Sequence, residues 1–290
     1  MAAKRSALRW GVEQRLEFIE FRLFWEGGVN RSEITDYFGL SVPQASKDLS
    51  RYQEIAPRNI EYDRSLKRYF ATKSFKPKFL DPDSDRYLSY LRSLADELLT
   101  PAETWISVVP EIATLPFPHR NIEPAILKPI LESVREKRSI RIYYQSLSSD
   151  RPEPIWREIS PHAFAFDGFR WHSRAFCHID KRFKDFLLPR ILEIGEQGDQ
   201  LETSAHDDAW NEITVVSLQP HPDLSEQQQY VVARDFGMNN RRIDIKVRRA
   251  LLYYFLKQMG LNFREHERPA HEQHVVLANP EDVKLALEGS

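Results

Sequence analysis

The chain has 290 residues, of which 41% are hydrophobic and 29% charged, and its formal net charge is −2 at pH 7. This composition is typical of a soluble globular protein of two or three domains, and no charge block or low-complexity tract predicts a disordered tail. No apolar run approaches the roughly 20 residues that span a bilayer, and the first residues lack the apolar core of a secretion signal. Cys177 is the only cysteine, which excludes an intramolecular disulfide. We therefore expect a cytoplasmic protein with no membrane partner.

Charge is distributed unevenly along the chain. Residues 1–78 hold 15 Lys and Arg against 10 Asp and Glu, whereas the remainder holds 26 against 33. A mildly basic end joined to an acidic body favours a DNA-binding end and a body with a different role.

The first elements in chain order predict a winged helix-turn-helix. Amphipathic spacing indicates helices over residues 12–25 and 31–38, and Gly39 supplies a tight turn into another helix over residues 42–55. Two short alternating segments within residues 60–71 then predict a β-hairpin. Such a unit places the second helix of its helix-turn-helix in the major groove of DNA. The apolar stripe of the first helix is predicted to contain Leu16, Ile19, Leu23 and Phe24.

The outward side chains of the 42–55 helix suit contact with DNA. Gln44 can pair with adenine, Lys47 can reach guanine or a phosphate, and the basic residues of the hairpin suit phosphates. The alternative is a solvated helix pair with ordinary surface charge, since helical hairpins are common. The full set of predicted DNA-binding residues is Ser41, Gln44, Ser46, Lys47, Arg51, Arg64, Lys67 and Arg68.

The rest of the chain predicts an α+β fold class. Helices are indicated over residues 85–99 and 122–137, after which the hydrophobic period changes to two. Four strands or bent strand pairs then predict a small antiparallel sheet or barrel. The last region alternates strands and helices and resembles half or more of a ferredoxin-like fold. The expected domains are a winged helix-turn-helix at 1–78, a helical linker at 79–138, a β-barrel-like domain at 139–205 and an α+β (ferredoxin-like) domain at 206–290.

The strand around Trp171 combines basic and aromatic side chains. Alternation places His172 and Arg174 on one face, where arginine can fork onto a phosphate and aromatic rings can stack on a base. The alternative is that both are ordinary exposed sheet residues paired with Asp or Glu. A metal site is disfavoured because the spacing of His172 and Cys177 matches no zinc pattern. No phosphate loop, nucleophile elbow or carboxylate pair indicates an enzyme, and no cofactor is expected.

The sequence Trp171-His172-Ser173-Arg174-Ala175-Phe176-Cys177 resembles the signature strand of the WYL-domain transcription regulators. It is similar to the Trp-His-x-Arg-Ala variant in the subgroup of repressors associated with BREX and CBASS anti-phage defence islands. The segments RWGVEQRLEFIEFRLFWEGGVNRSEI and HPDL…YVVARDFGM…IKVRRALLYYFL resemble the same subgroup, so the resemblance covers nearly all of the chain. His172 and Ser173 replace the name-giving Tyr-Leu pair, which leaves the ligand open.

The resemblance implies a homodimeric repressor of a phage-defence operon that binds double-stranded DNA at an inverted repeat. Its WYL domain would sense a nucleotide or nucleic-acid ligand, and its C-terminal domain would dimerise. The alternative is a nucleic-acid-binding accessory module of a defence system without promoter control. Placed by motif, the ligand-binding residues would be Tyr144, Gln145, Ser146, His162, Trp171, His172, Arg174 and Arg190.

Overall fold

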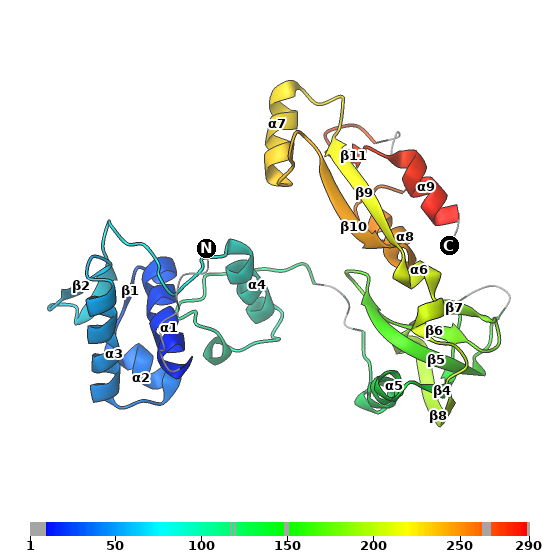
Figure 1. Ribbon diagram of the computed structural model, residues 1–290, viewed down its shortest axis with the longest axis horizontal. Helices are drawn as coiled ribbons and strands as arrows, with labels where there is room; N and C mark the ends of the chain where they lie inside the picture. The colour runs from blue at the N-terminus through cyan, green and yellow to red at the C-terminus, as the bar shows by residue number, and fades with distance from the viewer. Residues whose placement is uncertain (1–9, 117, 119, 148–150, 263–267, 289–290) are drawn as a thin grey trace. The chain divides into compact units, whose positions relative to one another are not determined.

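The computed structural model of the protein describes residues 10–116, 118, 120–147, 151–262 and 268–288 (Figure 1). The chain divides into two compact units, of which the first ends at residue 117 and the second begins at residue 118. Among the described residues, no helix is long and apolar enough to cross a membrane.

The first unit contains a three-helix winged helix domain followed by one further helix. Strands β1, β3 and β2 form an antiparallel sheet in that order, which is the wing. The predicted helix-turn-helix and hairpin are confirmed. The elements of this unit are α1 (Trp10–Glu26), β1 (Gly28–Val29), α2 (Arg31–Phe38), α3 (Val42–Ile55), β2 (Ile60–Asp63), β3 (Arg68–Ala71), α4 (Ser84–Ala95) and the 3-10 turn η1 (Pro101–Glu103).

Local sequence signals explain the turn and the core of this domain. Asn30 and Glu33 form a capping box at the start of α2, and Gly39 ends that helix in the left-handed region at φ 63°. Leu16 and Leu23 are buried in the shared core as predicted. The prediction for Phe24 is wrong, because it is 42% exposed. One residue beyond Leu23, a helix has turned by about 100°, which carries Phe24 away from the core.

A buried carboxylate attaches the segment after the wing to α1. Glu20 accepts backbone N–H groups of Lys78, Phe79 and Leu80 at 2.6–2.8 Å and the hydroxyl of Tyr52 at 2.9 Å. Burial and the adjacent Glu20 charge raise the pKa of Tyr52 well above its usual value, although the Asn59 hydrogen bond opposes this. The hydroxyl therefore stays protonated and able to donate.

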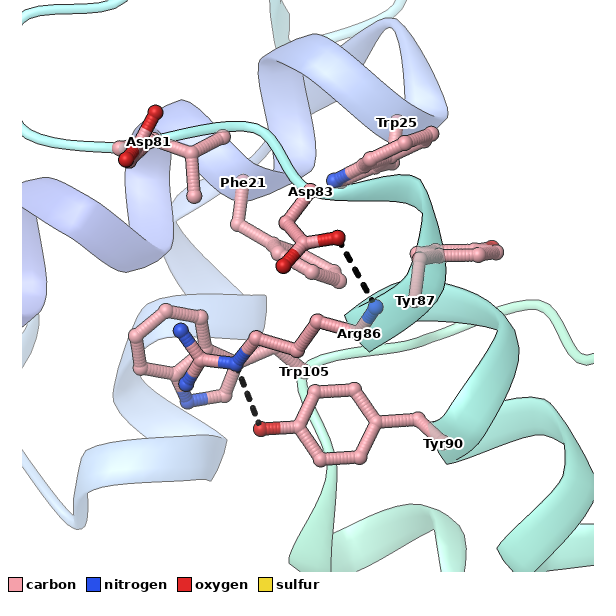
Figure 2. A pocket seen from close by; sticks show the side chains of 9 residues that line it. Phe21, Trp25, Asp81, Asp83, Arg86, Tyr87, Tyr90 and Trp105 are labelled. Carbon is pink, nitrogen blue, oxygen red and sulfur yellow. Dashed lines mark hydrogen bonds between the residues drawn. The ribbon is translucent and has the colours of Figure 1, made fainter. Parts of the chain in front are cut away.

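Helix α4 packs on α1 through an aromatic cluster (Figure 2). The rings of Trp25 and Tyr87 stack at 4.5 Å, and Arg86 Nε lies 3.3 Å from the hydroxyl of Tyr90. Helix α4 therefore belongs to the first unit, whereas the next helix, α5 (Pro124–Glu136), belongs to the second. The segment predicted as a linker contributes to both units, and the domain boundaries stay predictions.

The second unit begins with an open five-stranded sheet. The strands pair antiparallel in the order β7-β6-β5-β4-β8, with α5 packed on one face through Ile130. Strands β7 and β8 are the two edges, so the predicted β-barrel-like sheet does not close. Along the chain, Pro189 lies in the short turn that separates them, and its missing N–H suits a position outside the strand ladders. The elements are α5 (Pro124–Glu136), β4 (Arg138–Tyr144), β5 (Ile155–Phe166), β6 (Trp171–Cys177), β7 (Arg182–Leu187), the 3-10 turn η2 (Leu188–Arg190) and β8 (Ile191–Asp199).

The C-terminal part of this unit is a three-stranded antiparallel sheet in the order β10-β9-β11. Its core joins Val216 and Leu218 of β9 to Leu252 of α8 and Val283 of α9. The predicted α+β class is confirmed, with three described strands rather than the four of a complete ferredoxin-like fold. The elements are η3 (Ser204–His206), α6 (Asp208–Asn211), β9 (Ile213–Pro220), α7 (Glu226–Asp235), β10 (Ile243–Arg248), η4 (Arg249–Leu251), α8 (Leu252–Gln258), β11 (Val275–Leu277) and α9 (Pro280–Glu288).

Candidate functional site

Helix α3 buries one side and presents a polar side to solvent. Leu49 and Tyr52 are fully buried, whereas Lys47 and Arg51 are exposed and Ser46 is half-buried. Because the apolar residues recur every three or four positions, the polar residues between them share the outer surface. With Ser50, which is also exposed, the outer side of α3 therefore offers two hydroxyls and two cations for contact with a polyanion.

The two predicted residues at the start of α3 differ in their surroundings. Ser41 occupies the N-cap position and is exposed, without a side-chain capping bond. Gln44 donates to Asp48 Oδ1 at 3.1 Å, and Asp48 in turn pairs with Arg15 Nε at 2.6 Å. Gln44 would have to exchange this partner before it could read a base.

The wing divides its basic residues into two kinds. Asp63 accepts the backbone N–H of Ser65 at 2.7 Å and shapes the tip, where Arg64 and Lys67 are exposed. Arg68 instead donates to Glu33 Oε1 at 2.6 Å and to the Gly28 carbonyl at 2.7 Å. Arg68 therefore joins the wing to α2, while the tip residues have their charges in solvent.

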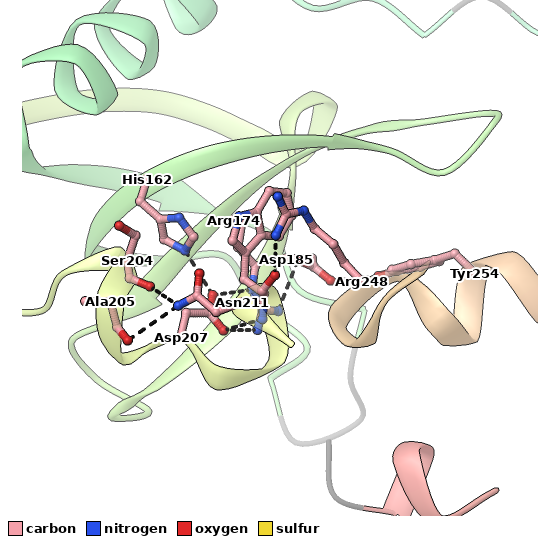
Figure 3. A network of polar contacts seen from close by, with 10 residues as sticks. His162, Arg174, Asp185, Ser204, Ala205, Asp207, Asn211, Arg248 and Tyr254 are labelled. Carbon is pink, nitrogen blue, oxygen red and sulfur yellow. Dashed lines mark hydrogen bonds and ion pairs between the residues drawn. The ribbon is translucent and has the colours of Figure 1, made fainter. Parts of the chain in front are cut away.

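The second candidate site is a buried polar network around Arg174 (Figure 3). Arg174 is 7% exposed, and its Nε and Nη2 fork onto the two oxygens of Asp207 at 2.8 and 2.9 Å. Its Nη1 lies 3.2 Å from Asp185 Oδ1. Burial alone would lower the pKa of Arg174, but the two carboxylates outweigh it and raise the pKa, so the guanidinium stays charged.

The Asp207 carboxylate forms hydrogen bonds with residues of three elements, β5, β6 and α6. Its carboxylate lies 2.9 Å from His162 Nε2 and also accepts the Trp210 backbone N–H at 3.2 Å, which caps α6. A register shift between Pro161 and Ala163 in β5 accompanies the placement of His162 in this network. Burial would raise the pKa of Asp207, but the bonds from Arg174 and His162 hold it well below its usual range. The network therefore holds the sheet and the start of the C-terminal region together through an ionised carboxylate.

His172 belongs to an adjacent cluster on the same strand. Its Nε2 lies 3.1 Å from Asp167 Oδ2, which also accepts Arg170 Nε at 2.8 Å. Burial opposes ionisation of Asp167, but these bonds prevail and hold its pKa at about 2. The His172 ring lies 5.2 Å from that of Tyr254, whose hydroxyl donates to Asp185 at 3.3 Å. Tyr254 thus connects the two clusters from α8.

The other predicted ligand-binding residues do not join this network. Tyr144 is in the core on the α5 side, and Gln145 donates to the Pro152 carbonyl at 3.0 Å. Trp171 is 48% exposed and packs on Phe166. Ser146 and Arg190 are half-buried. The structure therefore brings together three predicted residues, His162, His172 and Arg174.

Sequence reasoning missed the partners of these three residues. Asp207 is 33 positions from Arg174, and no local pattern marks that pairing. The available signal was general: a buried cation requires a carboxylate, so Arg174 had to pair with an Asp or Glu if its side of the strand was covered.

Two cavities flank Tyr254 beside the network. One is an open hollow of about 410 Å³ and is lined by Arg174, Phe183, Arg249 and Tyr253 among others. The other is an open hollow of about 380 Å³ and is lined in part by Lys246, Arg248 and Phe255. Both volumes lie in the range of small-molecule sites. In the described part of the chain, no three His, Cys, Asp or Glu side chains gather to hold a metal ion.

This arrangement of winged helix, central sheet and C-terminal α+β region is that of a WYL-domain transcriptional regulator. Residues 11–93 match the BrxR transcriptional regulator winged helix-turn-helix domain, residues 125–195 the WYL domain, and residues 213–283 the BrxR transcriptional regulator C-terminal dimerization domain.

Several proteins named DNA-binding transcriptional repressor CapW are similar over nearly the whole chain. The one from Pseudomonas aeruginosa is 40% identical over 280 residues, which cover 97% of this chain and 93% of that protein. Those from Stenotrophomonas maltophilia and Escherichia coli (strain KTE188) are 38% and 36% identical, covering 96% and 98% of this chain and 93% and 94% of those proteins. The chain belongs to this family of WYL-domain transcriptional repressors, which are regulators and not enzymes. The resemblance stated from the sequence is confirmed.

Proposed function

We propose that the protein is a homodimeric repressor that binds an inverted-repeat operator through α3 and the wing. The observation that carries this is the exposed polar side of α3, with Lys47 and Arg51, together with the exposed charges of the wing tip at Arg64 and Lys67. The relatives' name, DNA-binding transcriptional repressor, supports the same role. Two copies related by a two-fold axis would contact half-sites about 34–36 Å apart, or a multiple of that distance.

The regulated target in this proposal is a phage-defence operon that includes the protein's own gene. The resemblance of the Trp171–Cys177 strand to the subgroup from anti-phage defence islands supports it. The operator would then lie upstream of the gene for this chain.

A nucleotide or nucleic-acid ligand at the WYL domain would modulate this binding. Arg174 reaches the 410 Å³ cavity while Asp207 fixes its Nε and Nη2. A phosphate could therefore replace Asp185 at Nη1, since phosphate is a strong partner for arginine. Tyr253 and Phe183 line the same cavity and could stack on a base. The ligand would act only through a difference in its affinity for two conformations.

A reporter gene behind the promoter upstream of the protein's own gene tests the repressor role. The wild type should lower expression, and the Lys47→Ala, Arg51→Ala double variant should restore it. Lys128→Ala, which removes an exposed cation from α5, is the matched control and should repress normally. Full expression with the wild type, together with a preference for RNA or single strands in binding assays, would favour the accessory-module alternative instead.

Calorimetric titration with 5′-phosphorylated thymidine trinucleotide tests the ligand site. The wild type should bind, and Tyr253→Ala should lose at least tenfold in affinity, whereas Leu285→Ala, an exposed apolar residue outside the cavity, should not. Equal binding by all three proteins would remove this cavity from the proposal. No binding by the wild type would remove this ligand class.

A further inference from the structure

The open hollow of about 380 Å³ beside Tyr254, here called the β10–α8 hollow, lies between strand β10 and helix α8. Only the short turn η4 joins these two elements, so the chain reverses there and they pack against each other. Four consecutive residues of β10, 245–248, line the hollow, although the side chains of a strand alternate between its two faces. The hollow therefore follows the edge of β10 that pairs with no other described strand.

The turn between β5 and β6 forms the third side of this hollow. Gly168 in that turn has φ 87°, and a Cβ built there would come within 2.3 Å of Gln258 Oε1, so the turn and the end of α8 are in contact. Phe166 beside the turn is 47% exposed, Phe255 of α8 is half-buried, and both line the hollow. The hollow therefore has an aromatic side chain on two of its sides, against which a planar group can pack.

Two cations of β10 give the hollow a positive charge. Lys246 and Arg248 are exposed and lie two positions apart, which places their side chains on the same face of the strand. Lys246 has no ion-pair partner in the part of the chain that the structure describes. Arg248 donates to the Trp210 carbonyl and lies over the Trp210 ring at 4.7 Å, which holds its guanidinium in place. Because Asp167, the carboxylate that lines the hollow, already pairs with Arg170 Nε at 2.8 Å, the two cations remain available to an anion.

The cations and the amide of Gln258 lie toward opposite ends of the hollow. Arg248 comes before the start of α8, whereas Gln258 is the last residue of that helix. A helix rises 1.5 Å per residue, so the 7 residues of α8 extend over about 10 Å. The glutamine amide can both donate and accept hydrogen bonds. The hollow therefore suits an elongated ligand with an anion at one end and a polar planar group at the other.

We propose that the β10–α8 hollow is an effector site that binds a nucleoside monophosphate. The phosphate pairs with Lys246 and Arg248, because a phosphate dianion is a strong partner for two cations. The base packs against Phe166 and Phe255 and forms hydrogen bonds with Gln258. This site goes beyond the proposed function, since it lies outside the 410 Å³ hollow and requires neither DNA nor a dimer.

Cations at a strand edge have a second explanation. Lysine and arginine on an edge strand hinder its pairing with another chain, and that role alone would account for the charges of Lys246 and Arg248. Protection of an edge needs neither a hollow nor aromatic side chains. Here Phe166 and Gln258, from two other elements, line the same space as the cations. The convergence of cations, rings and an amide therefore favours a ligand site.

Calorimetric titration of the full-length chain with the four 5′-ribonucleoside monophosphates tests this site. At least one of them should bind with a dissociation constant below about 1 mM. The corresponding nucleoside and inorganic phosphate should each bind at least about tenfold more weakly, because each fills only one end of the hollow.

Three single variants locate the bound monophosphate. Lys246→Ala should weaken its binding at least about tenfold, and Phe166→Ala should reduce its advantage over inorganic phosphate to less than about threefold. Lys257→Ala removes an exposed cation of α8 that does not line the hollow, and it should change the affinity less than about twofold. Circular dichroism melts should be alike for the three variants, since all three side chains are exposed.

Three results would overturn the site, and each leaves the repressor and its trinucleotide site standing. Binding of none of the four monophosphates would leave Lys246 and Arg248 as protection of the edge alone. Equal weakening by Lys246→Ala and Lys257→Ala would show attraction to general surface charge. A monophosphate that Tyr253→Ala weakens and Lys246→Ala does not would lie in the 410 Å³ hollow instead, because Tyr253 lines only that one of the two.

Discussion

Helix α3 and strand β6 carry similar side chains, yet the fold treats them in opposite ways. In α3, Ser46, Lys47 and Arg51 lie next to buried apolar residues. In β6, His172, Ser173 and Arg174 do the same. In α3 the cations at 47 and 51 remain in solvent, whereas in β6 Arg174 is buried between two carboxylates. The same residue types therefore mark a free contact surface in one region and a neutralised internal network in the other.

The difference arises from what covers each element. One side of α3 packs on the core of the winged helix domain, and nothing else in the first unit covers its outer side among the described residues. Strand β6 has α5 beneath one face, and Asp207 and Tyr254 from the C-terminal region reach the other. A strand in the middle of a sheet can be buried on both faces, so its polar residues must find internal partners.

The largest expected effect tests whether Arg174 holds the fold together. Arg174→Ala should lower the free energy of unfolding by about 3–5 kcal/mol, because two buried carboxylates lose their cation. Urea denaturation measures this, with Arg182→Ala on the exposed end of β7 as the control. An unchanged urea midpoint for Arg174→Ala would mean that the network does not stabilise the unit, and the contrast with α3 would fail.

Acid should weaken the β6 region through Asp167. Its pKa is about 2 in the folded protein and about 4 in an unfolded chain. Its stabilising contribution is therefore complete above about pH 4 and is lost as the pH falls toward 2. Melting temperatures measured from pH 5 to pH 2.5 should fall more steeply for the wild type than for Asp167→Asn. Parallel curves would show that the bonds to Arg170 and His172 add nothing to stability.

On the DNA side, Lys47→Ala should weaken operator binding by about 1–3 kcal/mol if the side chain reads a base. Fluorescence anisotropy with operator and scrambled duplexes distinguishes a contact to a base from a contact to a phosphate. Equal loss on both, with a salt slope reduced by about 1, would make Lys47 a phosphate contact. Unchanged affinity on both would remove it from the interface.

The smallest expected effect separates the two kinds of wing arginine. Arg64→Ala should reduce the salt slope of binding by about 1 on every duplex and leave the melting temperature unchanged. Arg68→Ala should lower the melting temperature instead, because Glu33 and the Gly28 carbonyl lose their donor. The reverse pattern would mean that Arg68 is the phosphate contact and that its bond to Glu33 is dispensable.

Local patterns were sufficient to predict the helix-turn-helix and the hairpin of the first unit. The turn at Gly39, the helices on either side of it and the hairpin that follows each depend on residues within a few positions. The exposure of Lys47 also follows locally, since helical spacing alone separates it from Leu49. These features depend on short-range geometry, which a single sequence contains.

The surroundings of Arg174 could not be predicted in the same way. Alternation placed His172 and Arg174 on one face of β6, and the structure agrees, since Tyr254 contacts His172 and shares Asp185 with Arg174; alternation does not say what covers that face. Asp207 and Tyr254 come from elements 33 and 80 positions later in the chain. Pairings at that distance depend on tertiary packing, so the site residues derived from the strand remain predictions for ligand binding.

Binding of the purified protein to the duplex upstream of its own gene, against scrambled duplex of equal length across a salt series, tests the central claim most directly. We expect affinity for the upstream duplex to be at least about 10³-fold higher, which is the range of sequence-specific regulators. Equal and steeply salt-dependent binding to both duplexes would contradict the account, because α3 and the wing would then contact only phosphates.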